Sequence, residues 1–212
     1  MSARDGKPAT ARCRVPVAVL LSGGGRTLAN FLARAADGTL SISLVGVVSS
    51  RADARGVHIA REAGLPVGIF RRRDHADAAA HSRAINAWLA PLAPRMILLA
   101  GYLCHYTPPS DFEGPVLNIH PALLPRHGGQ GMYGDRVHAA VLAAGETESG
   151  CTVHRVDTIY DHGEILGQRR VPVLPGDDCH SLADRVFAQE CELYPEVVER
   201  LAREILAREA RR

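Results

Sequence analysis

The stretch VPVAVLLSGGG, residues 15–25, decides the fold class. Its first seven residues form a continuous apolar run rich in β-branched side chains, and glycines follow it. This pattern is typical of a strand that is buried on both faces, as strands of parallel sheets are. Residues 27–36 then predict a helix, because apolar side chains recur three and four residues apart from Leu28 to Ala35 and Asp37-Gly38 ends the pattern.

Strands and helices alternate through the rest of the chain. We expect further strands at residues 43–50, 66–70, 95–101, 116–120, 151–156 and 169–174. We expect further helices at residues 54–63, 76–89, near 135–144 and, as one long helix or a pair, at 181–211. Strands separated by helices predict right-handed crossovers and a doubly wound sheet. The predicted fold class is therefore α/β, with an open, twisted, mostly parallel sheet flanked by helices.

The domain organisation follows from what the chain lacks between these elements. No repeat, low-complexity tract or linker divides its 212 residues, a length that suits one sizeable domain. The first fourteen residues, MSARDGKPATARCR, are basic and polar and contain no apolar core of a signal peptide. We expect residues 1–14 to be a flexible tail and residues 15–212 to form a single domain.

The composition argues against several classes of protein. The formal net charge is only +2, and the basic residues form no stripe of the kind that binds nucleic acid. Five scattered cysteines without a CxxC pair favour neither a disulfide framework nor a zinc site, and the ten histidines show no metal-ligand spacing. No apolar run approaches the roughly 20 residues that span a bilayer. We expect a cytoplasmic protein without nucleic acid, membrane or metal partners.

The glycines of LLSGGGRTLAN, residues 20–30, form the first candidate site. A buried strand that runs through glycines into a helix brings free backbone N–H groups and the positive end of a helix dipole to one point. The stretch is neither a full GxGxxG fingerprint, since Leu28 stands at the third glycine position, nor a P-loop. It predicts a phosphate site, and the alternative is a plain tight turn.

The second candidate site is the stretch VLNIHPALLPR, residues 116–126. Asn118 and His120 are two residues apart at the carboxyl end of a strand, so their side chains share a face where open α/β sheets bind ligands. An amide N–H and an imidazole together suit an oxygen that gains negative charge during acyl transfer. The following Pro121 and Pro125 stiffen the turn.

A catalytic histidine needs a carboxylate that raises its pKa and fixes its tautomer. Candidates are Asp157, Asp161 and Glu164, in or beside a loop between two strands. Spacing alone does not choose among them.

Six blocks of sequence carry a resemblance to a known family. They are SGGGRTL, LAGYL, LNIHPALLPR, GCTVH, DHGEILGQ and RVFAQECELYP, in this order from about Val17 to the last helix. With them the chain resembles the folate-dependent formyltransferases, in particular the branch that formylates phosphoribosylglycinamide (GAR). The resemblance implies a Rossmann-like sheet and transfer of a formyl group from 10-formyltetrahydrofolate to the amine of GAR.

The resemblance also implies roles for individual residues. The family's catalytic Asn, His and Asp correspond to Asn118, His120 and Asp161, where Asn118 and a protonated His120 would hold the oxyanion of a tetrahedral intermediate and Asp161 would keep His120 charged. Residues implied to bind GAR are Gly25, Arg26 and Thr27 at the phosphate and Glu190 at the ribose, with Arg170 a weaker candidate for the phosphate. Residues implied to bind folate, largely through backbone groups, are Leu103, Cys104, His105, Tyr106 and Asn118.

The chain departs from the family pattern at three places. Cys104-His105 stands where better known members have an arginine, and a folate-contacting arginine of the preceding helix falls at or near Ala78. The region HGGQGMYGDRVHAAV, residues 127–141, is longer and richer in glycine than in many relatives. We expect His127, Tyr133 and His138 in this region to be structural, although each could enter the site.

Alternatives within the same chemistry are formyl transfer to another phosphorylated amine and hydrolysis of formyltetrahydrofolate. Transferases that act on methionyl-tRNA or on sugar nucleotides carry a further C-terminal domain, and the hydrolases carry an N-terminal one. The sequence extends only about 40 residues beyond VPVLPG and about 15 before the first strand, so we expect the stand-alone GAR enzyme, as a monomer or homodimer.

Two alternatives come from other classes. A nicotinamide-dependent oxidoreductase would have an acidic residue at the end of the second strand, which here ends SSRAD. A non-catalytic phosphoribosyl-binding module would give no reason for Asn118, His120 and Asp161 together.

Overall fold

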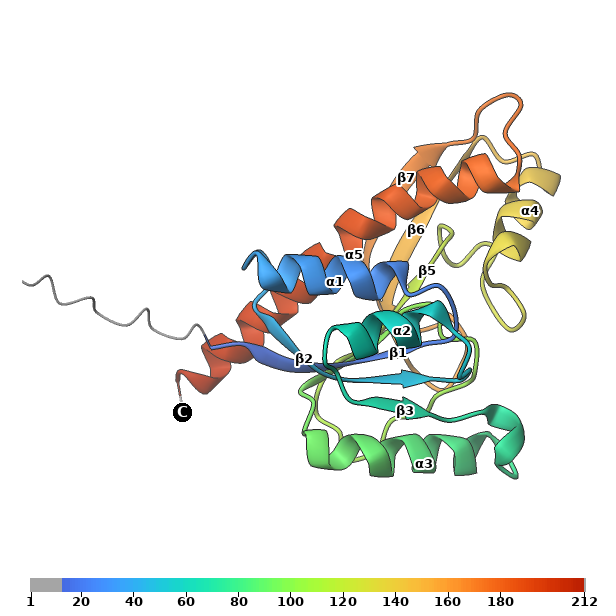
Figure 1. The fold of residues 1–212 in the computed structure, drawn as a ribbon. Coiled ribbons are helices and arrows are strands. Elements are labelled where there is room, and N and C mark those ends of the chain that lie inside the picture. The colour runs from blue at the N-terminus through green and yellow to red at the C-terminus, as the bar shows by residue number, and fades with distance from the viewer. Residues whose placement is uncertain (1–12, 212) are drawn as a thin grey trace, which may run out of the picture.

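The computed structural model describes residues 13–211, so the predicted flexible tail, residues 1–14, lies almost wholly outside the described residues. Within them, seven strands form one sheet in the order β3-β2-β1-β4-β5-β6-β7 (Figure 1). The strands are β1 (Val15–Leu21), β2 (Ile42–Ser49), β3 (Val67–Ile69), β4 (Met96–Leu99), β5 (Val116–His120), β6 (Glu148–Arg155) and β7 (Ile165–Pro172). The helices are α1 (Arg26–Ala36), α2 (Arg55–Glu62), α3 (Ala78–Leu89), α4 (Asp135–Ala143) and α5 (Cys179–Glu209), with short 3-10 turns η1 (Arg72–Asp74) and η2 (Ala90–Leu92).

The sheet is mostly parallel, as predicted. Strands β1 to β5 pair in parallel, whereas β6 is antiparallel to β5 and β7 is antiparallel to β6. β6 begins three residues before the predicted strand, and β7 begins at Ile165 rather than at Arg169. The predicted strand omits the first four residues of β7. This edge strand is buried at few positions, so its first half lacks a continuous apolar pattern.

Helices cover both faces of the sheet, and β1 shows why. Its alternate residues Val17, Val19 and Leu21 belong to the core beneath α1, α2 and α5. Ala18 and Leu20 point the other way and belong to a second core beneath α3. Figure 1 shows α1 and α2 on one side of the sheet and α3 on the other. The continuous apolar run of β1 is thus required by burial on two faces.

The strand order reverses between β1 and β4, and this creates the crevice of the fold. The chain proceeds from β1 to β2 and β3 on one side, then returns to β4 and β5 on the other. Connections that diverge from neighbouring parallel strands leave a gap at their carboxyl ends, where ligands of such sheets bind. The loops after β1, β4 and β5 meet at this gap.

The terminal helix α5 is continuous over 31 residues, so the alternative of a helix pair is wrong. It contains Pro195, which has no N–H for the carbonyl of Cys191 one turn earlier. Two side chains of α1 donate to this carbonyl instead, Asn30 through Nδ2 at 2.8 Å and Arg34 through Nη2 at 3.2 Å. The helix therefore continues past the proline because α1 satisfies the group that the proline leaves unpaired.

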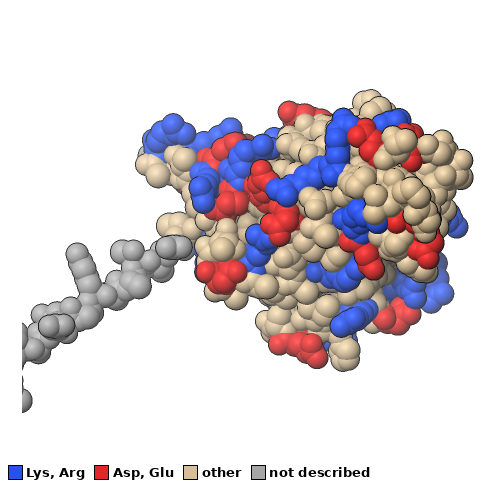
Figure 2. Space-filling view, turned by 90° about the horizontal axis from the view of Figure 1, so that it is seen from above, with Lys and Arg blue, Asp and Glu red and all other residues tan. Residues whose placement is uncertain are grey.

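The surface shown in Figure 2 carries basic and acidic side chains interspersed with one another, in keeping with a formal net charge of +2. Several of them form exposed ion pairs, such as Arg155 with Glu164 and Arg51 with Asp53. Among residues 13–211, no helix combines the length and the apolar character needed to cross a membrane.

Tyr194 connects α5 to the strands that lead to the crevice. Its side chain is fully buried and packs edge to face on Phe31, with ring centroids 5.1 Å apart. Its hydroxyl lies 3.1 Å from the carbonyl oxygens of both Leu99 in β4 and Leu117 in β5 and donates to them. The hydroxyl thus fixes α5 against the carboxyl end of β4.

We predict that Tyr194→Phe lowers the free energy of unfolding by about 1–3 kcal/mol, because buried carbonyl oxygens lose their donor while the ring stays in place. Urea unfolding measures the change. The control is Tyr133→Phe, which removes the hydroxyl of an exposed tyrosine and should change stability by less than about 0.5 kcal/mol. Equal effects of the two substitutions would contradict the anchoring role of Tyr194.

Candidate active site

A cavity of about 700 Å³ opens at the crevice. Its walls are the loops after β1, β4 and β5, the loop between β6 and β7, and the first half of α5. The residues that the sequence analysis proposed for catalysis or for substrate binding line it, with two exceptions, the candidate acid Glu164 and the weak phosphate candidate Arg170. Arg170 instead pairs with Glu148 on the neighbouring strand.

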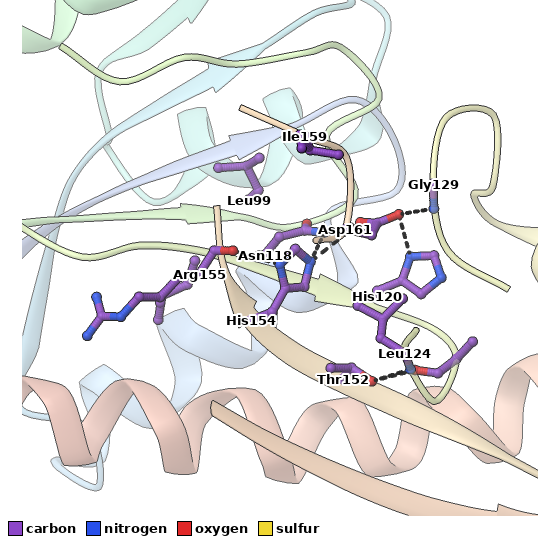
Figure 3. A network of polar contacts seen from close by, with 12 residues as sticks. Leu99, Asn118, His120, Leu124, Gly129, Thr152, His154, Arg155, Ile159 and Asp161 are labelled. Atoms are coloured by element: carbon purple, nitrogen blue, oxygen red, sulfur yellow. Dashed lines mark hydrogen bonds and ion pairs between the residues drawn. The ribbon is translucent and has the colours of Figure 1, made fainter. Parts of the chain in front are cut away.

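The carboxylate of Asp161 lies at the centre of a polar network on one wall of the cavity (Figure 3). Its Oδ2 accepts a hydrogen bond from the backbone N–H of Gly129 at 2.9 Å and lies 3.4 Å from Nδ1 of His120. Its Oδ1 accepts from Nδ2 of Asn118 at 3.3 Å and lies 3.4 Å from Nε2 of His154. Of the three candidate acids, Asp161 is therefore the one that lies beside His120.

The other two acids lie apart from this network. Asp157 is exposed and pairs with His162, and Glu164 is exposed and pairs with Arg155.

The Asp161 side chain is only 9% exposed, and burial by itself raises the pKa of a carboxyl group. The contacts with His154, His120 and the Gly129 N–H act in the opposite direction and outweigh burial, so the pKa of Asp161 lies below its ordinary value. Asp161 is consequently ionised at neutral pH.

His120 is almost completely buried, and both of its ring nitrogens have protein partners. Nε2 donates to the backbone carbonyl of His127 at 2.8 Å, while Nδ1 faces Asp161. Burial lowers the pKa of His120 and outweighs the opposing effects of Asp161 and of that carbonyl, so the net shift is downward. The expectation that Asp161 keeps His120 protonated therefore needs correction, because desolvation of the buried ring is the larger effect.

His154 is the member of the network that sequence reasoning missed. Its Nδ1 lies 2.8 Å from the carbonyl of Arg155, so this nitrogen carries the proton and Nε2 accepts a hydrogen bond from Asn118 Nδ2 at 3.1 Å. His154 lies directly opposite Asn118 in the antiparallel pair of β5 and β6. His154 is the last residue of the block GCTVH, which the sequence analysis quoted. Its contact with Asn118 becomes visible only from the pairing of β5 with β6.

The turn after β5 is fixed by a buried hydroxyl. Thr152 Oγ1 donates to the carbonyl of Ala122 at 2.6 Å and accepts from the N–H of Leu124 at 3.0 Å (Figure 3). Gln168 Nε2 donates both to this hydroxyl and to the carbonyl of Leu124, at 2.9 Å each. The backbone that follows His120 is thus held by β6 and β7.

The opposite end of the cavity is formed by the start of α1. The residue before the helix, Gly25, has a left-handed conformation with φ of 71°, and a Cβ there would lie 2.5 Å from the Cα of Gly56. No side chain caps the helix, so its first N–H groups are available to an anion. Arg26 and Thr27 also line this end, together with Glu190 of α5.

Glu190 is partly buried, and burial raises its pKa to about 7, although Arg26 acts to lower it. Near neutral pH this side chain is therefore present in both protonation states, and its carboxylic acid form can donate as well as accept a hydrogen bond.

The segment after β4 forms the third wall. Leu103 is 47% exposed, and its N–H donates to Ser22 Oγ at 2.9 Å. His105 Nε2 lies 3.2 Å from the carbonyl of Thr158, and its ring packs edge to face on Tyr160 at 5.2 Å. These two contacts join the segment to the loop that carries Asp161.

The two remaining residues of this segment are less exposed. Cys104 is partly buried at the cavity wall, and burial raises the pKa of its thiol. Tyr106 is almost completely buried, and its hydroxyl donates to Asn86 Oδ1 at 2.7 Å. Tyr106 thus faces the core of the sheet with most of its side chain.

The glycine-rich region after β5 contributes mainly backbone. The side chain of His127 points to Glu146, at 3.2 Å, and only its carbonyl reaches the network. Tyr133 and His138 line the cavity, and His138 is buried. Within the described part of the chain, no group of three or more His, Cys, Asp or Glu side chains has an arrangement that could hold a metal ion.

Comparisons with known proteins show the family to which the chain belongs. The family described as formyl transferase matches residues 15–198. The phosphoribosylglycinamide formyltransferase of Haemophilus influenzae is 35% identical over 184 residues, which are 86% of this chain and 84% of that protein. The chloroplastic enzyme of the same name from Vigna unguiculata is 40% identical over 195 residues, 90% of this chain. The chain spans only 62% of this relative and 64% of the one from Arabidopsis thaliana.

Solved structures give the same result for the fold. Glycinamide ribonucleotide transformylase 1 from Symbiobacterium toebii has a TM-score of 0.84 and 31% identity, covering 95% of this chain and 94% of that chain. Phosphoribosylglycinamide formyltransferase from Brucella melitensis has a TM-score of 0.79 and 39% identity, covering 89% and 96%. The matched region contains the glycine turn and all members of the Asp161 network, so the chain belongs to the formyl transferase family.

Proposed function

We propose that the protein transfers the formyl group of 10-formyltetrahydrofolate to the amine of GAR, a step of purine biosynthesis. One observation carries the proposal: the Asp161 network and the uncapped start of α1 open into the same cavity. A phosphorylated acceptor can thus bind by its phosphate at one end while its amine reaches the network at the other. The names of the relatives from Haemophilus influenzae and Symbiobacterium toebii support the choice of GAR.

In the proposed reaction, the GAR amine attacks the formyl carbon and the carbonyl oxygen becomes an oxyanion. Asn118 and His120 are the side chains of the network whose N–H groups hold this oxygen in the proposal. Both now donate to protein acceptors, so the oxyanion has to take over at least one of these contacts. The intermediate collapses when the bond from carbon to N10 of the folate breaks and a proton moves from the amine to N10.

The corrected protonation state of His120 fits this proton movement. A neutral imidazole can accept the proton that the amine loses on attack, and the ionised Asp161 stabilises the imidazolium that forms. His154 is a positioning residue in this scheme, because its Nε2 accepts from Asn118 and so directs the amide N–H groups toward Asp161.

The substrates occupy the remaining walls in this proposal. The phosphate of GAR binds at Gly25, Arg26 and Thr27, and Glu190 contacts the ribose hydroxyls. The folate binds along Leu103, Cys104, His105 and Tyr106, and backbone groups replace the arginines that the sequence lacks here. We further propose that residues 15–212 form one domain that works in the cytoplasm, as a monomer or homodimer, without metal or nucleic acid.

We predict that His120→Ala and Asp161→Asn each lower the rate of formyl transfer about 10²- to 10⁴-fold, because each removes a group that acts in the transition state. The measurement is the rate of tetrahydrofolate release from 10-formyltetrahydrofolate in the presence of GAR. Matched controls are His162→Ala and Asp74→Asn, which change the same residue types at exposed positions that do not line the cavity. Full activity of either network variant would overturn the mechanism.

The acceptor is tested by omitting it. The proposal predicts that tetrahydrofolate is released only when GAR is present. Release without any acceptor would identify a hydrolase, whereas release with a different phosphorylated amine and none with GAR would identify another transferase.

The raised pKa of Glu190 gives a prediction about stability. Between its ordinary pKa of 4.5 and about 7, the folded protein binds this proton more tightly than the unfolded chain, so wild-type stability falls as pH rises through this interval. Glu190→Gln cannot ionise. It should therefore raise Tm at about pH 8 and change Tm little at about pH 5. Thermal unfolding at both pH values measures the difference, with Glu204→Gln, exposed on the same helix, as the control. A shift independent of pH would contradict the burial of a protonated Glu190.

A further inference from the structure

The guanidinium of Arg26 lies over an aromatic ring beside the proposed phosphate site. Arg26 is the first residue of α1, and its guanidinium carbon lies 3.7 Å from the centroid of the Phe187 ring on α5. Both residues line the cavity. At this distance the cation and the ring attract one another, which restricts an otherwise flexible side chain. The two residues are far apart in sequence, so the contact depends on the packing of α1 against α5.

A second partner of Arg26 competes with any bound anion. Nη1 of Arg26 lies 3.5 Å from Oδ1 of Asp184, one turn before Phe187 on α5. The two side chains are 57% and 79% exposed, so this ion pair is weak. A phosphate dianion that also binds the N–H groups at the start of α1 offers the guanidinium a stronger partner than one solvated carboxylate.

We propose that Phe187 is a positioning residue for the phosphate of the acceptor: its ring holds the Arg26 guanidinium at the start of α1, while Asp184 occupies that guanidinium until phosphate replaces it. The inference rests on the proposed function, because it assumes that the acceptor's phosphate binds at this helix start. It assigns a role to a side chain that makes no polar contact itself.

The chemistry of arginine makes this arrangement effective. A guanidinium is planar, so stacking one face on a ring leaves the N–H groups at its edge free to donate to phosphate oxygens. Preordering the long side chain removes part of the entropy cost of binding. Removal of the ring should therefore weaken binding of phosphorylated ligands without altering the rest of the site.

The test measures binding of ribose 5-phosphate and of ribose to the full-length protein by NMR titration. Phe187→Leu, which keeps an apolar side chain but removes the ring, should weaken ribose 5-phosphate binding about three- to tenfold. Phe187→Tyr keeps the ring and should bind like the wild type. Asp184→Asn removes the competing charge and should strengthen binding, whereas Asp74→Asn, which changes an exposed acid away from the cavity, serves as its matched control.

A double-mutant cycle separates this role from a general effect on the fold. Once Arg26→Ala has removed the cation, the further change Phe187→Leu should have no additional effect on phosphate binding. Thermal unfolding of each variant checks that the helices still pack. The inference is overturned if Phe187→Leu binds ribose 5-phosphate like the wild type, or if its effect adds fully to that of Arg26→Ala.

The same titrations distinguish failure of the inference from failure of the proposed function. If the wild type binds ribose 5-phosphate and Phe187→Leu binds it equally well, only the role proposed for Phe187 is wrong. If the wild type shows no preference for ribose 5-phosphate over ribose, the phosphate site itself is wrong, and the inference fails with it.

Discussion

The buried carboxylate of Asp161 imposes the main constraint on this structure. An ionised group taken out of water is costly unless donors surround it, and no single element of the fold can supply enough of them. The donors here are Asn118 at the carboxyl end of β5 and the backbone N–H of Gly129 in the glycine-rich loop, and the rings of His120 and His154 each lie 3.4 Å from the carboxylate. The antiparallel pairing of β6 with β5 therefore has a direct role at the site, since it brings His154 opposite Asn118.

The two ends of the cavity differ in how firmly their groups are held. Asn118, His120 and Asp161 are buried or nearly so, and the turn after β5 is tied to Thr152 by two hydrogen bonds. At the start of α1, by contrast, Arg26 is more than half exposed and is held by a ring and a weak ion pair. The firmly held side chains around Asp161 favour a fixed geometry for bond formation. The loosely held Arg26 favours exchange of its partner Asp184 for another anion.

The sequence predicted most of the fold because burial on two faces leaves continuous apolar runs in β1 and β4. It failed where contacts depend on pairing between distant segments. His154 contacts Asn118 because the register of β6 against β5 places the two residues opposite each other. The contact of Arg26 with Phe187 depends on the packing of α1 against α5. The protonation state of His120 was likewise beyond sequence, because Asp161 and burial act in opposite directions and only the three-dimensional surroundings decide the balance.

The carbonyl of Cys191 shows how a local defect can link distant positions of a chain. Pro195 leaves this carbonyl without a donor inside α5, and Asn30 and Arg34 supply the missing hydrogen bonds from α1. A residue with an N–H at position 195 would compete with these donors, and loss of both donors would leave the proline uncompensated. The stability of α5 at Pro195 thus depends on the side chains at positions 30 and 34, although these belong to another helix.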